Sequence, residues 1–241
     1  MKDPVLLTPR TLGVSLWTGP PVPGTAPASL PRGRAPCCPG AVRIAILGSG
    51  QVGQALARGW AAHGHDVVIG TRQTAVEDLT VAPPAEAVRD ADLVVLAVRG
   101  TAAVELVRSL AGELDGRVLV DATNPLEMGD RGPTLFVGTT DSLGEQVQRA
   151  APSARVVKAY NTVGNALMVD PDLPGGPPTM FLAGDDPDAK QQVGDLLQAT
   201  GWDVADLGGI EASRGLEAMC LAWVAYGART GTWGHAFKLL R

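Results

Sequence analysis

The chain has 241 residues, enough for one domain with a substantial core or for one domain and a small second one. Hydrophobic residues make up 45% of it and the formal net charge is −5, so its composition is that of an ordinary globular protein and suggests neither a nucleic-acid nor a membrane partner. Its three cysteines form no paired framework, which predicts a reducing compartment and a cytoplasmic protein.

The first 41 residues differ from the rest of the chain. Nine of the 19 prolines lie there, without any sustained hydrophobic periodicity, so the segment cannot bury enough apolar surface to fold. We therefore predict a disordered leader over residues 1–41 and a folded domain over residues 42–241. An alternative is that the biological chain starts at Val42, because "VRIAILGSG" makes a natural first strand.

From Val42 onward, apolar strand segments alternate with helical segments. The predicted strands are "VRIAIL", "DVVIGT", the short "LTV", "ADLVVLAV", "RVLVDAT", "ARVVKAYN", "TMFLAG" and "WDVADLG". Helices are predicted over residues 51–62 and 101–113, over "SLGEQVQRAA", over "DDPDAKQQVGDLLQAT", and from about 211 to 227. This alternation predicts an α/β fold of the Rossmann type, with a doubly wound, mostly parallel sheet and residues 210–241 as a small helical C-terminal element.

Three glycines follow the first strand in "ILGSGQVGQALA". Gly48 permits the tight turn out of the strand, Gly50 lacks the Cβ that would collide with phosphates, and Gly53 lets the helix pack closely on the sheet. The pyrophosphate of a dinucleotide needs the backbone N–H groups and the positive dipole end that such a helix start offers. The motif between a strand and a helix therefore predicts a dinucleotide site.

The end of the second predicted strand indicates which dinucleotide binds. An NAD site expects a carboxylate there, but Thr71 and Arg72 occupy the place and no carboxylate follows until Glu77. A hydroxyl beside a guanidinium suits the 2′-phosphate of NADP, and the missing acid also argues against S-adenosylmethionine. The alternative for Arg72 is a solvated charge in a loop.

The segments "ILGSGQVGQALA", "HDVVIGTR", "ADLVVLAV", "DATNP", "KAYNT" and "LAGDD" occur in this order. In these segments the chain resembles the family of deazaflavin (coenzyme F420)-dependent NADP oxidoreductases, over essentially all of residues 42–241. It is also similar to the reductase part of the STEAP ferric reductases and to the N-terminal domain of pyrroline-5-carboxylate reductases. A long helical dimerisation domain of the latter kind has no room here, because only about 30 residues follow the last predicted strand.

The resemblance implies that the glycine loop and the Thr-Arg pair bind NADP(H) and that later strand ends lie along the cofactor. The nicotinamide end is expected near "KAYNT", whereas Arg99-Gly100 replaces the family's common proline and aromatic pair and leaves the contacts to the second substrate open. The candidate cofactor-binding residues are Gly48, Ser49, Gly50, Gln51, Val52, Gly53, Thr71, Arg72, Ala97, Val98, Arg99, Asn124, Ala159 and Asn161.

No catalytic acid or base stands out. The chain has no Tyr-x-x-x-Lys pair, its three histidines are not spaced as metal ligands, and we interpret Lys158 and Asp121 as structural residues. Hydride transfer between two stacked rings needs orientation and exclusion of water more than a proton relay, whereas a carbonyl substrate usually needs an acid. The lack of a candidate catalytic acid therefore favours a flavin-like acceptor over a carbonyl substrate.

The prediction is thus an NADP(H)-dependent oxidoreductase that exchanges hydride with a deazaflavin, a flavin or a similar soluble small molecule. We expect the acceptor ring between the carboxyl ends of the strands and the last helix, covered by side chains such as Leu221, Trp223 and Phe237. Two alternatives are a non-enzymatic NADPH-binding sensor and a small imine or carbonyl reductase. A homodimer is left open.

Overall fold

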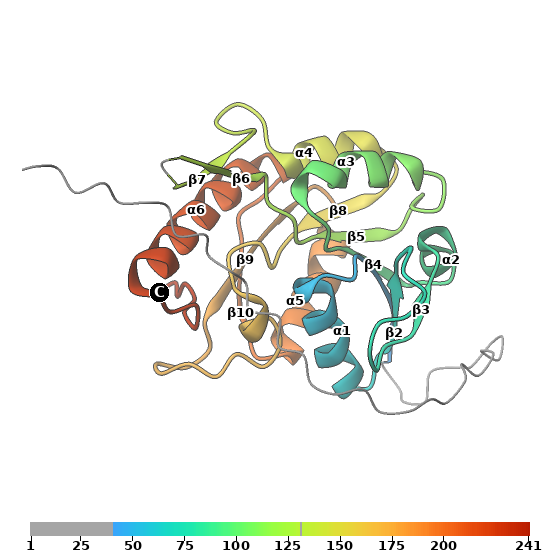
Figure 1. Cartoon of the computed structure of the whole chain (residues 1–241), viewed down its shortest axis with the longest axis horizontal. Coiled ribbons are helices and arrows are strands. Elements are labelled where there is room, and N and C mark those ends of the chain that lie inside the picture. Colours follow the sequence, from blue (N-terminus) through green and yellow to red (C-terminus); the bar gives the residue numbers. More distant parts are fainter. Residues whose placement is uncertain (1–40, 131) are drawn as a thin grey trace, which may run out of the picture. The chain divides into compact units, whose positions relative to one another are not determined.

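The computed structural model describes residues 41–130 and 132–241 (Figure 1), so the predicted leader, apart from Ala41, lies outside the described residues. Eight strands form one sheet in the order β10-β9-β8-β5-β4-β1-β2-β3. Their bounds are β1 (Arg43–Leu47), β2 (Asp66–Gly70), β3 (Val81–Ala82), β4 (Leu93–Leu96), β5 (Val118–Asp121), β8 (Arg155–Lys158), β9 (Thr179–Gly184) and β10 (Asp203–Asp206). A separate antiparallel hairpin consists of β6 (Leu126–Gly129) and β7 (Gly132–Leu135).

The sheet is parallel from β3 to β8. β9 pairs antiparallel with β8, and β10 runs parallel to β9, so the last two strands have the opposite direction. The chain moves outward from β1 to β2 and β3, then crosses back to place β4 on the other side of β1. This reversal of strand order is the place where open parallel sheets bind ligands, at the carboxyl ends of the strands.

Helices cover both faces of the sheet, as Figure 1 shows for α3 and α4 on one side and α1 and α5 on the other. Ile44 and Ile46 of β1 belong to the core beneath α1 and α5, whereas Ala45 and Leu47 belong to the core beneath α2, α3 and α4. Burial on both faces explains why this strand is a continuous apolar run. The helices are α1 (Gln51–Ala62), α2 (Pro84–Arg89), α3 (Gly100–Ser109), α4 (Leu143–Ala150), α5 (Pro187–Ala199) and α6 (Ser213–Thr230), with 3₁₀ turns at Asn165–Leu167 and Ile210–Ala212.

The predicted doubly wound, mostly parallel Rossmann-type fold is confirmed, and most element boundaries agree within a few residues. The side chain of Asp186 caps α5 as predicted, because it accepts a hydrogen bond from Ala189 N at 2.7 Å. The short helix α2 and the β6-β7 hairpin were not predicted. Both are brief and flanked by proline or glycine, so neither shows enough periodicity for recognition.

The C-terminal element is helical only in part. α6 ends at Thr230 because Gly231 adopts a left-handed conformation with φ +71°, and residues 231–241 contain no further helix or strand. We call these residues the C-terminal tail. The tail returns to the sheet, where Thr179 N donates to Phe237 O at 2.9 Å and Leu239 N donates to Thr179 Oγ1 at 3.0 Å. Within the described part of the chain, no helix is long and apolar enough to cross a membrane.

Candidate functional site

The turn between β1 and α1 depends on two glycines for its shape. Gly48 has φ +125°, and a Cβ at this position would run into the carbonyl oxygen of Ala97, which directly follows the neighbouring strand β4. A Cβ on Gly53 would likewise run into the carbonyl oxygen of Gly48. These two glycines therefore permit β1, its turn and the first turn of α1 to pack against one another.

Gly50 has a different environment. It is exposed, it precedes α1 with φ −75°, and a Cβ built on it would meet no atom within 4 Å. The first turn of α1 carries no acidic residue and no side-chain cap, so its backbone N–H groups remain free for a ligand. This open space in front of a helix N-terminus fits the pyrophosphate of a dinucleotide.

Two hydroxyl groups lie together at the ends of β1 and β2. Thr71 Oγ1 donates to Ser49 Oγ at 3.2 Å and accepts from Gln73 N at 3.2 Å. Parallel pairing of Leu47 with Gly70 brings the two strand ends side by side, so residues 22 positions apart meet here. Arg72 follows directly and is exposed, beside the region where the ribose of a bound dinucleotide would lie.

A cleft with two connected hollows continues from this turn. The hollows have volumes of about 330 Å³ and 590 Å³, and they share Val52, Asn124 and Leu126. The smaller hollow is also lined by Ala97, Val98, Arg99, Gly100, Thr101, Ala122 and Thr123. The larger one is also lined by Gln51, Asn161, Val163, Gly164, Asn165, Ala166, Cys220, Trp223, Val224, Trp233 and Gly234.

The cleft brings together about half of the residues that the sequence singled out. Those that line it are Gln51, Val52, Ala97, Val98, Arg99, Asn124 and Asn161. Ala159 does not, because its side chain is completely buried in the core beside β8. Of the three side chains expected over an acceptor, Trp223 lines the larger hollow, whereas Leu221 and Phe237 are not among its lining residues.

Two asparagines form a reciprocal pair at the junction of the hollows. Asn124 Nδ2 donates to Asn161 O at 2.8 Å, and Asn161 Nδ2 donates to Asn124 Oδ1 at 3.0 Å and to Leu216 O at 2.9 Å. Tyr160, directly before Asn161, has φ +61°, a conformation that costs a non-glycine residue about 1–2 kcal/mol. Its buried ring packs edge-on against Trp60, which holds this conformation in place.

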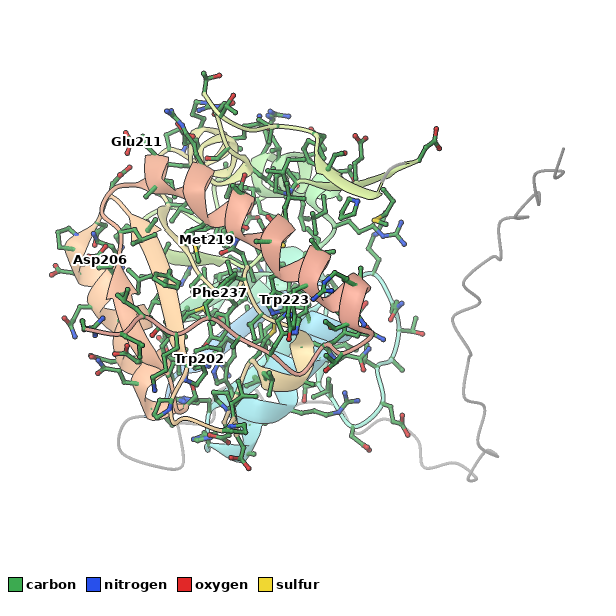
Figure 2. The ribbon with its side chains drawn as sticks, turned by 90° about the vertical axis from the view of Figure 1, so that its left-hand side faces the viewer. Trp202, Asp206, Glu211, Met219, Trp223 and Phe237 are labelled. Carbon is green, nitrogen blue, oxygen red and sulfur yellow. The ribbon has the colours of Figure 1, made fainter. Side chains whose placement is uncertain are left out.

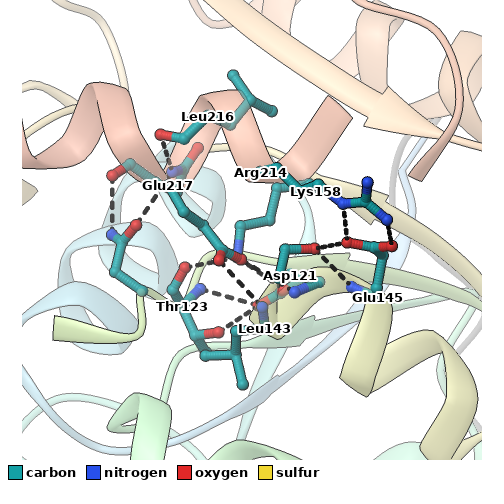
Figure 3. Close-up of polar contacts among 12 residues, drawn as sticks. Asp121, Thr123, Leu143, Glu145, Lys158, Arg214, Leu216 and Glu217 are labelled. Atoms are coloured by element: carbon teal, nitrogen blue, oxygen red, sulfur yellow. Dashed lines mark hydrogen bonds and ion pairs between the residues drawn. The ribbon is translucent and has the colours of Figure 1, made fainter. Parts of the chain in front are cut away.

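A buried ionic cluster lies behind the cleft (Figure 3). Lys158 Nζ donates to Asp121 Oδ2 at 2.9 Å, to Glu217 Oε1 at 2.8 Å and to Thr123 O at 2.8 Å. Burial alone would lower the pKa of Lys158, but the charges of Asp121 and Glu217 raise its pKa above the ordinary value, so the ammonium stays charged. Neither Lys158 nor Asp121 lines the cleft, which agrees with a structural role for both.

The same cluster attaches α6 to the start of α4. Glu217 accepts hydrogen bonds from Leu143 N at 3.0 Å and from Gly144 N at 2.9 Å, so its carboxylate satisfies two free N–H groups at that helix N-terminus. One turn earlier, Arg214 binds Glu145 through two hydrogen bonds of 2.8 and 2.5 Å. Nothing in the local sequence pattern signals these contacts.

Aromatic side chains from α6 and the tail form one side of the larger hollow. Trp223 Nε1 donates to His235 O at 2.8 Å, and the Trp223 and His235 rings stack with centroids 4.7 Å apart. The centroids of Trp223 and Trp233 are 5.4 Å apart. Figure 2 shows the tail returning from the end of α6, with Trp223 on the helix and Phe237 further along the tail. Trp233 was not among the side chains that the sequence led us to expect over an acceptor.

The cleft carries little acid or base chemistry. Among the described lining residues only Arg99 and Cys220 are ionisable. Burial raises the pKa of the Cys220 thiol to about 12, so this thiol is protonated and a poor nucleophile near neutral pH. The arrangement can therefore bind and orient planar groups and exclude water, but it offers no proton relay.

Comparisons with known proteins agree with this geometry. Residues 43–125 match the family described as "NADP oxidoreductase coenzyme F420-dependent". The chain is 30% identical over 200 residues to the F420-dependent NADP reductase of Methanothermobacter marburgensis, a match that covers 73% of this chain and 88% of that protein. A crystal structure of a candidate F420-dependent NADP-reductase from Arthrobacter sp. FB24 superposes with a TM-score of 0.78 at 38% identity, covering 83% of this chain and 100% of that chain.

Two further relatives are matched over less of their own length. The chain is 31% identical over 188 residues to the metalloreductase STEAP3 of Rattus norvegicus, covering 75% of this chain but 37% of that protein. It is 31% identical over 137 residues to the F420-dependent NADP reductase of Methanocaldococcus jannaschii, covering 56% of this chain and 61% of that protein. The chain therefore spans less than two thirds of either relative.

Proposed function

The chain belongs to the family of coenzyme F420-dependent NADP oxidoreductases, and on this premise we propose that it transfers hydride between NADP(H) and a soluble deazaflavin or flavin. The observation that carries this proposal is the cleft, which joins an open helix N-terminus to an aromatic-sided hollow almost without ionisable side chains. Such a cleft suits ring-to-ring hydride transfer better than reduction of a carbonyl group.

The glycine loop and the Ser49-Thr71 pair form the NADP half of the proposed site. Gly50 leaves room for the pyrophosphate in front of α1, where backbone N–H groups would bind its oxygens. Ser49, Thr71 and Arg72 would hold the 2′-phosphate, because a guanidinium and hydroxyl groups match its charge and its acceptor oxygens. From there the cofactor would extend past Ala97, Val98 and Arg99 towards the two asparagines.

The asparagine pair would position the reacting ends. Asn161 Oδ1 is buried and has no hydrogen-bond partner within the described residues, so it is free to accept a bond from a bound carboxamide N–H. Bound NADPH would supply the hydride, and the protein would hold the two rings in contact. Val52, Val163 and Trp223 would keep water away from them.

Spectrophotometry with the purified full chain tests this proposal. NADPH is mixed with a panel of acceptors comprising coenzyme F420, FMN, FAD, a ferric chelate, a ketone and an imine, and the loss of nicotinamide absorbance is followed. We expect turnover with the deazaflavin or a flavin. NADPH deuterated on the transferred face should deliver its label to the deazaflavin carbon, because direct transfer excludes exchange with solvent.

Two results would replace the proposal with one of the alternatives from the sequence. Binding of NADPH without turnover of any acceptor would indicate a sensor, and turnover of the ketone or the imine alone would indicate a small-molecule reductase. A cytoplasmic location stays a prediction from the sequence, which leaves the oligomeric state open.

A further inference from the structure

Trp233 of the C-terminal tail is the most exposed large aromatic side chain on the cleft. It lines the larger hollow, yet 48% of its surface remains accessible to solvent, whereas Trp223 beside it is only 8% exposed. A covered indole buries more apolar surface than most side chains do. A half-exposed indole at the edge of a hollow therefore has a large apolar face that a ligand could cover.

The surrounding residues hold Trp233 in this position. A Cβ built on Gly227 of α6 would lie 2.5 Å from the Trp233 ring, so only a glycine permits the indole to lie this close to the helix. The left-handed Gly231 reverses the chain just before it. After it, His235 Nε2 and Trp223 O lie 3.1 Å apart, and Trp223 Nε1 donates back to His235 O.

Less of the Trp223 ring is open to a ligand, because only 8% of this residue is exposed, His235 stacks on it with an interplanar angle of 21°, and the Trp233 ring centroid lies 5.4 Å from its own. The larger hollow also contains Gln51 and Val52 from the start of α1, where the NADP half of the proposed site begins. No residue with an ordinarily charged side chain is among the described residues that line this hollow. A planar ring of low charge is the ligand that matches such walls.

We propose that Trp233 is a specificity-determining residue for the hydride acceptor: its indole stacks on the deazaflavin or flavin ring, so that the tail belongs to the acceptor half of the site and not to the NADP half. This inference rests on the proposed function. It assigns to Trp233 a contact that selects flat aromatic acceptors over small imines and ketones, which have no ring of this size to stack.

The test compares Trp233→Leu with Trp233→Phe. Leucine keeps apolar bulk against Gly227 but removes the aromatic face, and phenylalanine keeps both. We expect Trp233→Leu to raise the KM for coenzyme F420 about tenfold or more while the Kd for NADPH, measured by calorimetry, changes less than twofold. Trp233→Phe should stay within about threefold of the unchanged protein, since it retains an aromatic ring.

Leu240→Ala is the matched control, because Leu240 is an apolar tail residue that is 83% exposed and does not line the cleft. It should leave both constants unchanged. The inference is overturned if Trp233→Leu leaves the KM for coenzyme F420 within twofold, or if it weakens NADPH binding as much as acceptor binding. Failure of the unchanged protein to turn over any flavin or deazaflavin would instead refute the proposed function on which the inference rests.

Discussion

At the scale of single residues, the three glycines of the loop have different physical tasks. Gly48 and Gly53 have no room for a Cβ, because backbone oxygens of the protein itself fill that space. Gly50 has open space around its Cβ position, and the lack of a side chain there leaves this space to a ligand. The motif spacing predicts the loop, but only the structure separates the glycines that shape it from the one that faces the proposed cofactor.

Gly50→Val should abolish NADPH binding and leave the fold intact. The substituted residue keeps an ordinary φ and its Cβ meets no protein atom within 4 Å, but its side chain would fill the space of the pyrophosphate. Calorimetric titration with NADPH and a thermal melt measure the two properties. Gly112→Val is the control, since Gly112 also has open space around its Cβ position but does not line the cleft. Unchanged affinity in Gly50→Val would show that the loop is only a turn.

Arg72→Ala should remove most of a preference for NADPH over NADH. A hydrogen bond to a charged group contributes about 1.5–3 kcal/mol, or roughly 10- to 150-fold in affinity. Because Arg72 is exposed, we expect the lower end of this range. The ratio of the two Kd values measures the preference, with Arg108→Ala on the far end of α3 as a control. Equal binding of both nucleotides by the unchanged protein would contradict the NADP assignment.

At the scale of elements, α6 is held in place by charge. Glu217 on this helix reaches both Lys158 of β8 and the N-terminus of α4, while Leu216 beside it accepts the hydrogen bond of Asn161. The position of α6 therefore determines the position of the asparagine pair and of Trp223 in the cleft. Breaking a buried ion pair by removing one partner typically costs about 3–5 kcal/mol, because the remaining charge is left buried without a partner.

The second contact between α4 and α6 predicts a dependence of stability on pH. The hydrogen bonds from Arg214 hold the pKa of Glu145 below its ordinary range. A lowered pKa in the folded state contributes stability that is complete above the unfolded pKa of about 4.3, and that is lost as the pH falls through the folded pKa. Arg214→Met should therefore be less stable than the unchanged protein at pH 7, and the difference should shrink below about pH 4.

Urea unfolding at several pH values measures this difference. Arg108→Met is the control, because its pair with Glu105 lies on the exposed surface of α3 and contributes little at any pH. A difference between Arg214→Met and the unchanged protein that is as large at pH 3 as at pH 7 would mean that packing of the arginine, not its charge, stabilises the contact.

At the scale of the whole molecule, the tail connects the end of α6 to the far edge of the sheet. Besides the bonds of Phe237 and Leu239 to Thr179, Lys238 Nζ donates to Gly175 O at 2.7 Å and Arg241 pairs with Asp203 of β10 at 2.9 Å. The tail also covers one face of Trp223, because the ring of His235 stacks on it. One segment thus binds the first residues of β9 and β10 and completes the larger hollow.

Ending the chain at Gly231 should lower the Tm by about 5–10 °C, because a domain of this size loses roughly 2–4 °C per kcal/mol and the tail makes several hydrogen bonds to the rest of the fold. The Kd for NADPH should stay nearly unchanged, since the glycine loop lies on other elements. Deletion of residues 1–41 is the control, and the composition of that segment predicts no change in Tm. If the truncated protein has the same Tm as the full chain, the tail does not contribute to the stability of the fold.

The sequence by itself determined the fold class, the glycine loop and the Thr71-Arg72 pair. These signals are local: apolar runs of strand length, helical periodicity and glycine spacing each depend on a few consecutive residues. The pairing of Asn124 with Asn161, the attachment of Lys158 to Glu217 and the place of Trp233 on the cleft were decided only by the tertiary structure. The partners in the first two lie 37 and 59 positions apart, and Trp233 reaches the cleft only because Gly231 reverses the chain. Contacts of this kind depend on how elements pack, and no local pattern in one chain encodes that packing.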